Sequence, residues 1–142
     1  MPIHTGSARY EGFGKDGKGQ ISTQSGVLSD QPYGFATRFE DAPGTNPEEL
    51  IAAAHASCFT MATSFALARA GYSDGTLDTQ CAVTLEKDGD GFKITKSALI
   101  LTASIPGIDE AEFFRIADEA KAGCPVSKLL NCEITLERSL SA

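Results

Sequence analysis

The sequence predicts an α+β fold in one domain that spans residues 1–142. Segments in which apolar and polar residues alternate, as in half-buried β-strands, occur near both ends of the chain and in its middle. Between them lie segments with apolar residues three and four positions apart, which is the spacing of a helix face. The sequence contains no internal repeat, low-complexity tract or linker. Its length is ordinary for a single hydrophobic core.

The first forty residues predict three strands joined by glycine-rich turns. Residues 7–13 and 18–25 alternate weakly and flank the sequence GKDGKG, which is typical of a hairpin turn. A third strand is expected over residues 33–39. Its aromatic residues occupy alternate positions: Tyr33, Phe35 and Phe39.

A long helix is expected to follow, with Pro47 in its first turn and Gly71 just beyond its end. Thr45 or Asn46 can cap it, and the spacing of Thr45 and Glu48 predicts a capping box. An apolar stripe recurs along the helix: Ile51, Ala54, Cys58, Met61, Phe65 and Ala68. Alanines cover most of the remaining surface, so we expect this helix to be buried on several sides. Polar residues interrupt it too often for a membrane span.

The second half of the chain predicts another hairpin, a helix and a final strand. Residues 79–87 and 92–104 alternate well and are separated by DGDG. Asp109 is expected to cap the next helix, with Glu112 three residues on. The apolar face of that helix is expected to comprise four residues: Phe113, Ile116, Ala117 and Ala120. A last strand is predicted over residues 132–140.

The composition argues against several classes of function. The net charge is −7, from 12 basic and 19 acidic residues, and the sequence has no basic cluster. We therefore expect neither nucleic acid nor a membrane as a partner. The first residues lack the charged and apolar regions of a secretory signal, which favours a cytoplasmic location. The four cysteines include no CxxC pair, so structural disulfides are not expected.

The cysteines differ in their predicted surroundings. Cys58 lies mid-helix on the apolar stripe, where packing in the core is the simpler interpretation and a reactive thiolate would need a separate cation. Cys124 follows Gly123, which ends a helix, and precedes Pro125, which begins a short one. It therefore stands at an N-cap, where helix amides lower the pKa of a thiol. The alternative, a turn cysteine that only fills a gap in the packing, remains open. Two further cysteines are expected to pack in or beside strands without a catalytic role: Cys81 and Cys132.

A thiol on a helix and a second thiol at a helix start suggest reversible disulfide chemistry. Reduction of a peroxide would also need a positive group to hold the thiolate, and Arg38 is the best candidate because arginine stays charged when partly buried. Glu48 is a candidate to orient its guanidinium in a bidentate pair. The simpler interpretations, a solvated charge for Arg38 and a capping carboxylate for Glu48, remain open.

Two long segments, residues 32–62 and residues 106–130, resemble the osmotically inducible protein C (OsmC) family. This family is a sister group of the organic hydroperoxide resistance proteins, and the similarity extends over nearly the whole chain. The resemblance implies an OsmC-like fold, in which strongly curved antiparallel sheets wrap around central helices in an intertwined homodimer. It also implies Cys58 as the peroxidatic thiol, Cys124 as the resolving thiol, Arg38 as the activator of Cys58 and Glu48 as the residue that orients Arg38.

The same resemblance implies a peroxidase that acts in oxidative and osmotic stress defence. Its substrates would be organic hydroperoxides, with hydrogen peroxide used less well, and it would need no cofactor or metal. Electrons would come from an external thiol or dithiol. Dihydrolipoyl groups serve as the donor in the sister group, so a lipoylated protein is a candidate partner.

The spacing of Glu48 and Cys58 predicts a site shared between subunits. Ten residues of straight helix separate them by about 15 Å along the axis and by roughly 80° around it. One Arg38 would not easily contact both side chains within one chain. We therefore hypothesise that Arg38 and Glu48 of one subunit serve Cys58 and Cys124 of the other.

Three alternatives remain open at this point. Cys58 with His55, three residues earlier, could serve a hydrolase or acyl transferase, although no third orienting residue is apparent. The chain could instead be a dimeric binding protein without enzymatic activity, in which Cys58 belongs to the core. A metal site built from Cys58, His55 and Cys124 ranks last, because it lacks the paired spacing of zinc ligands.

Overall fold

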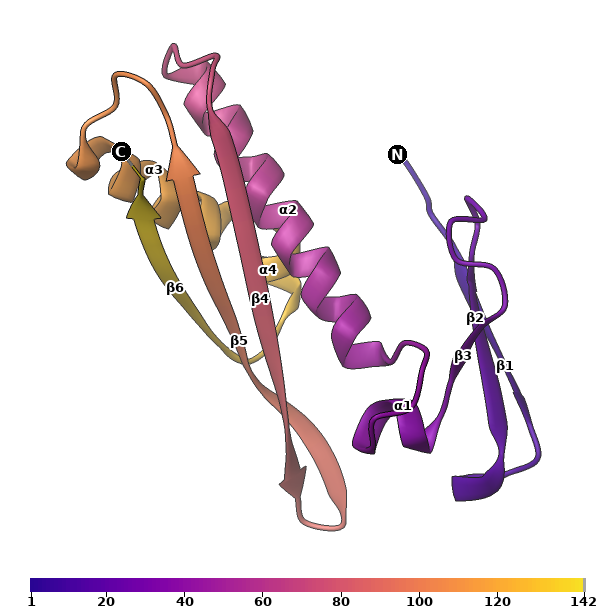
Figure 1. Cartoon of the computed structure of the whole chain (residues 1–142). Helices are drawn as coiled ribbons and strands as arrows, with labels where there is room; N and C mark the ends of the chain where they lie inside the picture. Colours follow the sequence, from indigo (N-terminus) through magenta and orange to yellow (C-terminus); the bar gives the residue numbers. More distant parts are fainter. Residues whose placement is uncertain (142) are drawn as a thin grey trace. The chain divides into compact units, whose positions relative to one another are not determined.

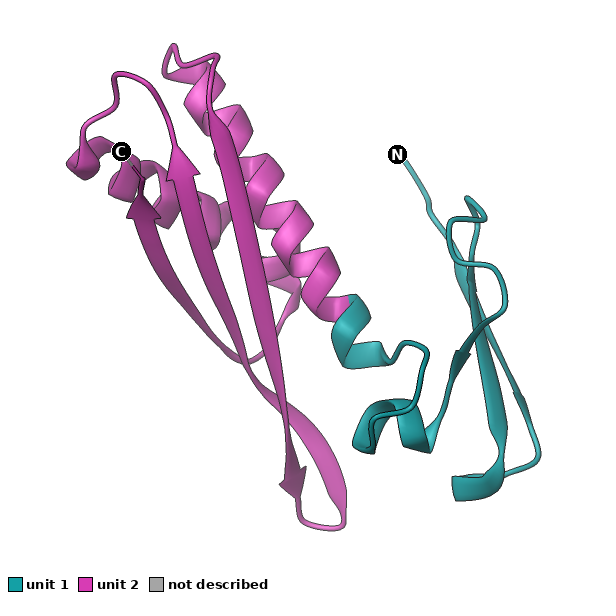
Figure 2. Cartoon of the chain, viewed as in Figure 1, with its two compact units in different colours: residues 1–50 teal, residues 51–142 magenta. Residues whose placement is uncertain are grey.

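The computed structural model describes residues 1–141, and the chain forms two compact units. Figure 2 shows the first unit, residues 1–50, in teal and the second, residues 51–142, in magenta. Each unit is built around its own three-stranded sheet. The expectation of a single domain over residues 1–142 stays a prediction.

The first unit contains a three-stranded antiparallel sheet in the order β1-β2-β3 (Figure 1). Its elements are β1 (Gly6–Glu11), the 3-10 turn η1 (Gly14–Asp16), β2 (Lys18–Thr23) and β3 (Gln31–Tyr33). The predicted first hairpin is therefore confirmed. Gly19 of β2 leaves room for the neighbouring Tyr33 ring, because a Cβ at this position would lie 2.5 Å from a ring carbon.

The strand predicted over residues 33–39 is wrong beyond Tyr33, because this segment turns into the short helix α1 (Phe35–Phe39). Thr37 fixes the helix start: its hydroxyl accepts a hydrogen bond from the Gly34 amide at 2.8 Å. The rings of Phe35 and Phe39 lie 5.1 Å apart, one helical turn from each other. Aromatic residues four positions apart fit both a strand face and a helix face, so the pattern alone did not distinguish them.

The long helix α2 (Pro47–Arg69) begins where it was predicted, but its cap differs in detail. Asn46 caps the helix, since its Oδ1 accepts a hydrogen bond from the Glu49 amide at 2.8 Å. The capping box predicted between Thr45 and Glu48 is wrong, because the Thr45 hydroxyl donates to the Glu49 carboxylate at 3.0 Å instead. The Glu48 carboxylate therefore takes no part in a capping box and is available to another side chain.

The apolar stripe predicted on α2 is not its buried face. The buried residues form a neighbouring row: His55, Phe59, Thr63 and Leu67. Met61 and Phe65 are 61% and 59% exposed. The prediction failed because two polar residues lie in the buried row, where internal hydrogen bonds satisfy them. Gly71, with φ of 99°, follows the helix end as predicted.

Helix α2 is also long and apolar enough to cross a membrane by length and composition alone, with a mean hydropathy of 1.5 over an 18-residue window. Only 22% of that window is buried inside the chain. Long core helices of soluble proteins have the same length and composition. The helix therefore presents an apolar surface that the described chain itself does not cover.

The second unit contains the other three-stranded sheet, in the order β4-β5-β6. Its further elements are β4 (Thr76–Asp88), β5 (Gly91–Ser104), α3 (Glu110–Gly123), α4 (Pro125–Leu129) and β6 (Glu133–Leu140). Strands β4 and β5 form the predicted hairpin, and β6 pairs in parallel with β5. Asp109 caps α3 by accepting a hydrogen bond from the Glu112 amide at 2.8 Å, as predicted.

One face of the second sheet is buried. Alternate residues of β5 face the core: Ser97, Leu99, Leu101 and Ala103. They pack with residues of α2 and α3: Phe59, Leu67, Phe113, Ile116, Ala117 and Ala120. Cys124 belongs to the same core. This packing holds α2 and the α3–α4 junction together.

Candidate active site

Two of the four cysteines meet in the second unit, although 66 residues separate them in the sequence (124 minus 58). Cys58 projects from α2, and Cys124 lies where α3 ends and α4 begins. The two thiols are close enough to share a hydrogen bond, and both are free rather than disulfide-bonded. Cys124 is fully buried, whereas Cys58 is partly exposed. The structure thus brings together the pair that the sequence singled out.

Cys124 caps α4, as the sequence predicted. The Ser127 amide donates a hydrogen bond to its sulfur at 3.3 Å. Burial alone would raise the pKa of the Cys124 thiol, but hydrogen bonds with the side chain and amide of Ser127, with Cys58 and with the Val126 amide together hold that pKa below its ordinary value. Cys124 is therefore the more acidic thiol of the pair.

The pKa of the Cys58 thiol is raised rather than lowered. Burial raises the pKa of its thiol, the Val126 amide lowers it in part, and the hydrogen bond and charge of Cys124 raise it further. Within residues 1–141, no cation is among the groups that shift this pKa. This agrees with the expectation that mid-helix Cys58 needs a separate positive group to become a thiolate.

A buried hydrogen-bond network adjoins the cysteine pair, and the serines that take part in it were not predicted from the sequence. His55 is fully buried, with Nδ1 2.6 Å from Ser97 Oγ and Nε2 2.8 Å from Ser127 Oγ. Cys81 reaches the same network, with its sulfur 3.1 Å from Ser97 Oγ. Ser97 and Ser127 lie 42 and 72 residues from His55, so no local motif could have indicated the contact.

The hydrogen bonds of His55 argue against two alternative functions, a hydrolase or acyl transferase and a metal site. Both of its ring nitrogens are engaged by serine hydroxyls, so His55 is not paired with the Cys58 thiol as a hydrolase would require. The same two contacts leave neither nitrogen free to join Cys58 and Cys124 around a metal ion.

Lowering the pH from 7.5 to 5 is expected to decrease the free energy of unfolding through His55. Burial lowers the pKa of His55 in the folded chain, so the unfolded chain binds the proton more readily and acid favours unfolding. The free energy of unfolding begins to decrease as the pH falls through about 6.5, the ordinary pKa of histidine. It continues to decrease down to the lower pKa that His55 has in the folded protein. Urea titrations at each pH measure it.

The matched controls are His55→Gln and His4→Gln. His55→Gln should weaken the dependence of the unfolding free energy on pH between 7.5 and 5, whereas His4→Gln, at an exposed position near the N-terminus, should leave it unchanged. Equal slopes for the wild type and His55→Gln would contradict the assignment.

In the first unit, Arg38 and Glu48 form the predicted bidentate pair. Arg38 Nε lies 2.7 Å from Glu48 Oε1, and Arg38 Nη2 lies 3.1 Å from Oε2. The Phe39 ring lies beside the guanidinium, with its centroid 5.5 Å from Arg38 Cζ. The Glu48 side chain is 12% exposed and that of Arg38 35%, so the guanidinium is held firmly while part of it stays accessible.

A pocket of about 330 Å³ opens beside this guanidinium, within the first unit. Four aromatic residues line it: Tyr10, Tyr33, Phe35 and Phe39. Lys15 and Arg38 supply its positive charges. Met61 borders a separate shallow pocket over α2.

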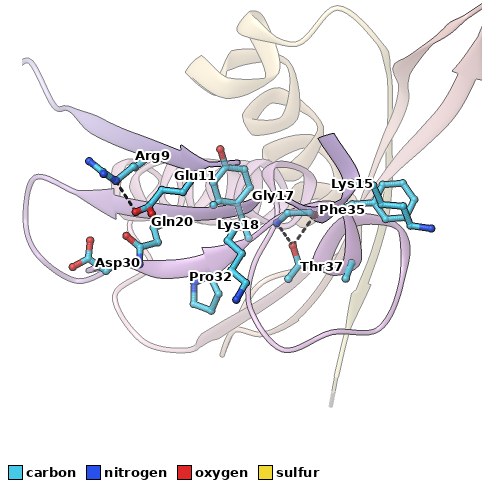
Figure 3. Close-up of a pocket in the computed structure, with 14 residues that line it drawn as sticks. Arg9, Glu11, Lys15, Gly17, Lys18, Gln20, Asp30, Pro32, Phe35 and Thr37 are labelled. Carbon is cyan, nitrogen blue, oxygen red and sulfur yellow. Dashed lines mark hydrogen bonds and ion pairs between the residues drawn. The ribbon is translucent and has the colours of Figure 1, made fainter. Parts of the chain in front are cut away.

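A larger pocket of about 560 Å³ shares Tyr33 and Phe35 with the pocket beside Arg38 and is lined by several charged residues. Figure 3 shows the side chains of both signs that surround it, including Arg9, Lys18 and Asp30. Arg9 is paired with Glu11 at 3.0 Å within this pocket. Its cations are thus partly neutralised, and it contains no cysteine.

A known family and a known protein resemble this chain over most or all of its length. The model of the family "OsmC-like protein" matches residues 39–139. Peroxiredoxin OsmC of Escherichia coli (strain K12) is 54% identical over 143 residues and covers all of both chains. The chain belongs to the OsmC-like family. An organic hydroperoxide resistance protein of Xanthomonas axonopodis pv. citri is 33% identical over 96 residues, which cover 66% of this chain and 66% of that one.

The OsmC fold is confirmed by the solved structures as well. The crystal structure of an organic hydroperoxide resistance protein OsmC from Legionella pneumophila has a TM-score of 0.69 and 25% identity, and each chain is covered completely. In this OsmC-like chain, the family match includes α2, the cysteine pair and the Glu48 carboxylate, and it begins one residue after Arg38. The full-length match with the Escherichia coli protein includes Arg38 too.

Proposed function

We propose that this OsmC-like protein is a thiol-dependent peroxidase that reduces organic hydroperoxides to alcohols. The observation that supports the proposal is the proximity of the Cys58 and Cys124 thiols, each of which shifts the pKa of the other. The names of the relatives, a peroxiredoxin and organic hydroperoxide resistance proteins, support the same reaction. They offer no support for a hydrolase or for a binding protein without enzymatic activity.

The reaction begins when the Cys58 thiolate attacks the distal oxygen of the hydroperoxide. The O–O bond breaks, the alkoxide leaves and takes up a proton as an alcohol, and Cys58 becomes a sulfenic acid. Cys124 then attacks the oxidised sulfur, the S–O bond breaks, water leaves and a Cys58–Cys124 disulfide forms. An external thiol or dithiol restores both cysteines through a mixed disulfide. A dihydrolipoyl group on a partner protein is the donor that we propose.

Arg38 is the residue that we assign to the activation of Cys58. The thiolate needs a cation because burial raises the pKa of its thiol. Glu48 holds the Arg38 guanidinium through two hydrogen bonds, which aims its remaining N–H groups at one place. A fixed guanidinium stabilises both the thiolate and the negative charge on the departing oxygen.

The pocket beside Arg38 supports organic hydroperoxides as substrates. Four aromatic side chains line it, so an apolar substituent on the peroxide gains contact area that hydrogen peroxide lacks. The Arg38 guanidinium lies at the same pocket and marks where the peroxide oxygens bind. Hydrogen peroxide is therefore the poorer substrate.

We further propose that the working form is a cytoplasmic homodimer. Helix α2 exposes apolar side chains, Met61 and Phe65 among them, beside alanines that permit close approach of a second helix. Association of two copies buries this face. It also allows Arg38 and Glu48 of one subunit to serve Cys58 and Cys124 of the other.

Treating the reduced protein with one equivalent of cumene hydroperoxide is expected to lower its intact mass by about 2 Da, because a disulfide removes two hydrogens. Digestion under non-reducing conditions should yield a peptide pair joined through Cys58 and Cys124. The variant Cys132→Ser serves as the control and should lose the same mass. Four thiols that remain reduced while the peroxide persists would refute the proposed reaction.

A further inference from the structure

The hydrogen-bond network around His55 ends at the sulfur of Cys124. The Cys124 thiol donates a hydrogen bond to Ser127 Oγ at 3.4 Å, and Ser127 Oγ lies 2.8 Å from His55 Nε2. On the far side of the imidazole, Nδ1 lies 2.6 Å from Ser97 Oγ. Three elements thus supply one continuous chain of donors and acceptors: α4, α2 and β5.

The hydrogen bonds of this series all run in one direction in one tautomer of His55. When Nδ1 carries the proton and donates to Ser97, Nε2 is free to accept the hydroxyl proton of Ser127. The oxygen of Ser127 then has its lone pairs available to the thiol of Cys124. Every hydrogen bond in the series from Cys124 to Ser97 then points the same way, as transfer of a proton away from the sulfur requires.

The surroundings of His55 favour its neutral form. The groups that face the ring are the hydroxyls of Ser97 and Ser127 and the Cys81 thiol, whose sulfur lies 3.9 Å from Nδ1. None of these partners bears a formal charge, since burial raises the pKa of Cys81 and keeps it a thiol. Burial likewise lowers the pKa of His55, so its Nε2 lone pair is available near neutral pH.

We infer that Ser127 and His55 form a relay that takes the proton from Cys124 when this thiol attacks the sulfenic acid of Cys58. Ser127 touches the reacting sulfur and is the catalytic residue, whereas His55 acts through Ser127 and is a positioning residue. The inference rests on the proposed peroxidase function. It assigns the relay to the second step alone, the formation of the disulfide.

The step balances as follows. The proton of the Cys124 thiol passes to Ser127 Oγ while the hydroxyl proton of Ser127 passes to His55 Nε2. The electron pair on the Cys124 sulfur forms the S–S bond, and the S–O bond of the Cys58 sulfenic acid breaks with its pair on oxygen. The departing oxygen takes up the relayed proton and leaves as water, so His55 returns to neutral. The Cys58 sulfur is reduced and the Cys124 sulfur is oxidised.

The relay is tested by timing the two steps separately. Reduced protein is mixed with cumene hydroperoxide, samples are quenched over time with dimedone, and mass spectrometry measures sulfenic acid at Cys58 and the Cys58–Cys124 disulfide. The variants are His55→Gln and Ser127→Ala. Ser57→Ala is the matched control, since its exposed hydroxyl donates only to the Ala54 carbonyl within α2.

In both relay variants we expect unchanged oxidation of Cys58 and disulfide formation slowed by about 10²-fold at pH 7, the scale of one general base. The trapped sulfenic acid should accumulate accordingly. Raising the pH until the Cys124 thiol ionises without the relay should restore the rate. Glutamine keeps a hydrogen bond to Ser127 but takes no proton, so His55→Gln separates proton transfer from mere geometry.

Two results would overturn the relay: disulfide formation at the wild-type rate in both variants, or slowing that is the same at every pH. A wild-type protein in which cumene hydroperoxide does not oxidise Cys58 would instead refute the proposed function. If His55→Gln fails to fold, Ser127→Ala decides the question, because Ser127 is only partly buried.

Discussion

Cys58→Ser is expected to abolish turnover of organic hydroperoxides, with kcat/KM lowered by about 10³-fold or more, the scale on which loss of a catalytic nucleophile acts. A serine hydroxyl at this position is not ionised near neutral pH, and it does not accept oxygen from a peroxide as a thiolate does. The rate is measured by the disappearance of cumene hydroperoxide in the presence of excess dithiol.

Comparison with the other cysteines makes this prediction specific. Cys124→Ser should still consume one equivalent of peroxide, because its Cys58 is intact, but oxidation should stop at a sulfenic acid that dimedone traps. Cys132→Ser should turn over like the wild type. If Cys58→Ser retained activity, Cys58 would be a core residue and the proposed reaction would lose its nucleophile.

Arg38→Ala is expected to lower kcat/KM for cumene hydroperoxide by about 10²- to 10³-fold, because one fixed positive donor to the thiolate and the departing oxygen is lost. Arg38→Lys should recover little of this activity, since a lysine keeps the charge but not the planar fork that Glu48 orients. The free energy of unfolding should change by about 1 kcal/mol or less, because the ion pair is partly exposed.

Mixing subunits tests whether Arg38 acts across the dimer. Inactive Cys58→Ala and inactive Arg38→Ala proteins are unfolded together, refolded and assayed. A heterodimer would combine an intact Arg38–Glu48 pair from one subunit with an intact cysteine pair from the other, and activity should return. Refolding each variant alone is the control. An inactive mixture that nevertheless contains heterodimers by native mass spectrometry would place both halves of the site in one chain.

The sequence predicted most of the fold because its strongest signals are local. The turn sequences GKDGKG and DGDG lie in the two antiparallel hairpins, and Asn46 and Asp109 cap the helices that they precede. The predicted family is confirmed, because its model matches residues 39–139 and a relative that is 54% identical matches the full length of the chain. These signals depend on neighbours within about five residues, which a single sequence displays directly.

The wrong predictions share a physical cause. The spacing of apolar residues does not show which other parts of the chain a segment packs against. The spacing of Phe35 and Phe39 fits a strand and a helix equally well. In the structure the Thr37 hydroxyl accepts from the Gly34 amide at the start of a helix. On α2, the apolar stripe with Met61 and Phe65 was assumed to be buried within the chain, yet a row with His55 and Thr63 is buried instead. Polar side chains enter a core when distant partners satisfy them, and a single sequence does not reveal those partners.

The candidate site was predicted in part for the same reason. Cys124 was predicted to be an acidic thiol from its position at a helix start, and the structure places it there. The Arg38–Glu48 pair has the bidentate geometry that was expected. Ser97 and Ser127 were missed because serines are common and neither belongs to a motif. Only the packing of β5 and α4 against α2 shows that they hold His55.

The position of Cys124 between two helices links chemistry to local order. Its amide donates to the Ala120 carbonyl at the end of α3, and its sulfur accepts from the Ser127 amide at the start of α4. A sulfur bound in a disulfide is a poorer acceptor than a thiolate, so oxidation weakens the first hydrogen bond of α4. We therefore expect the redox state of this sulfur to affect the backbone at the start of α4, beside the bond that a reductant must break.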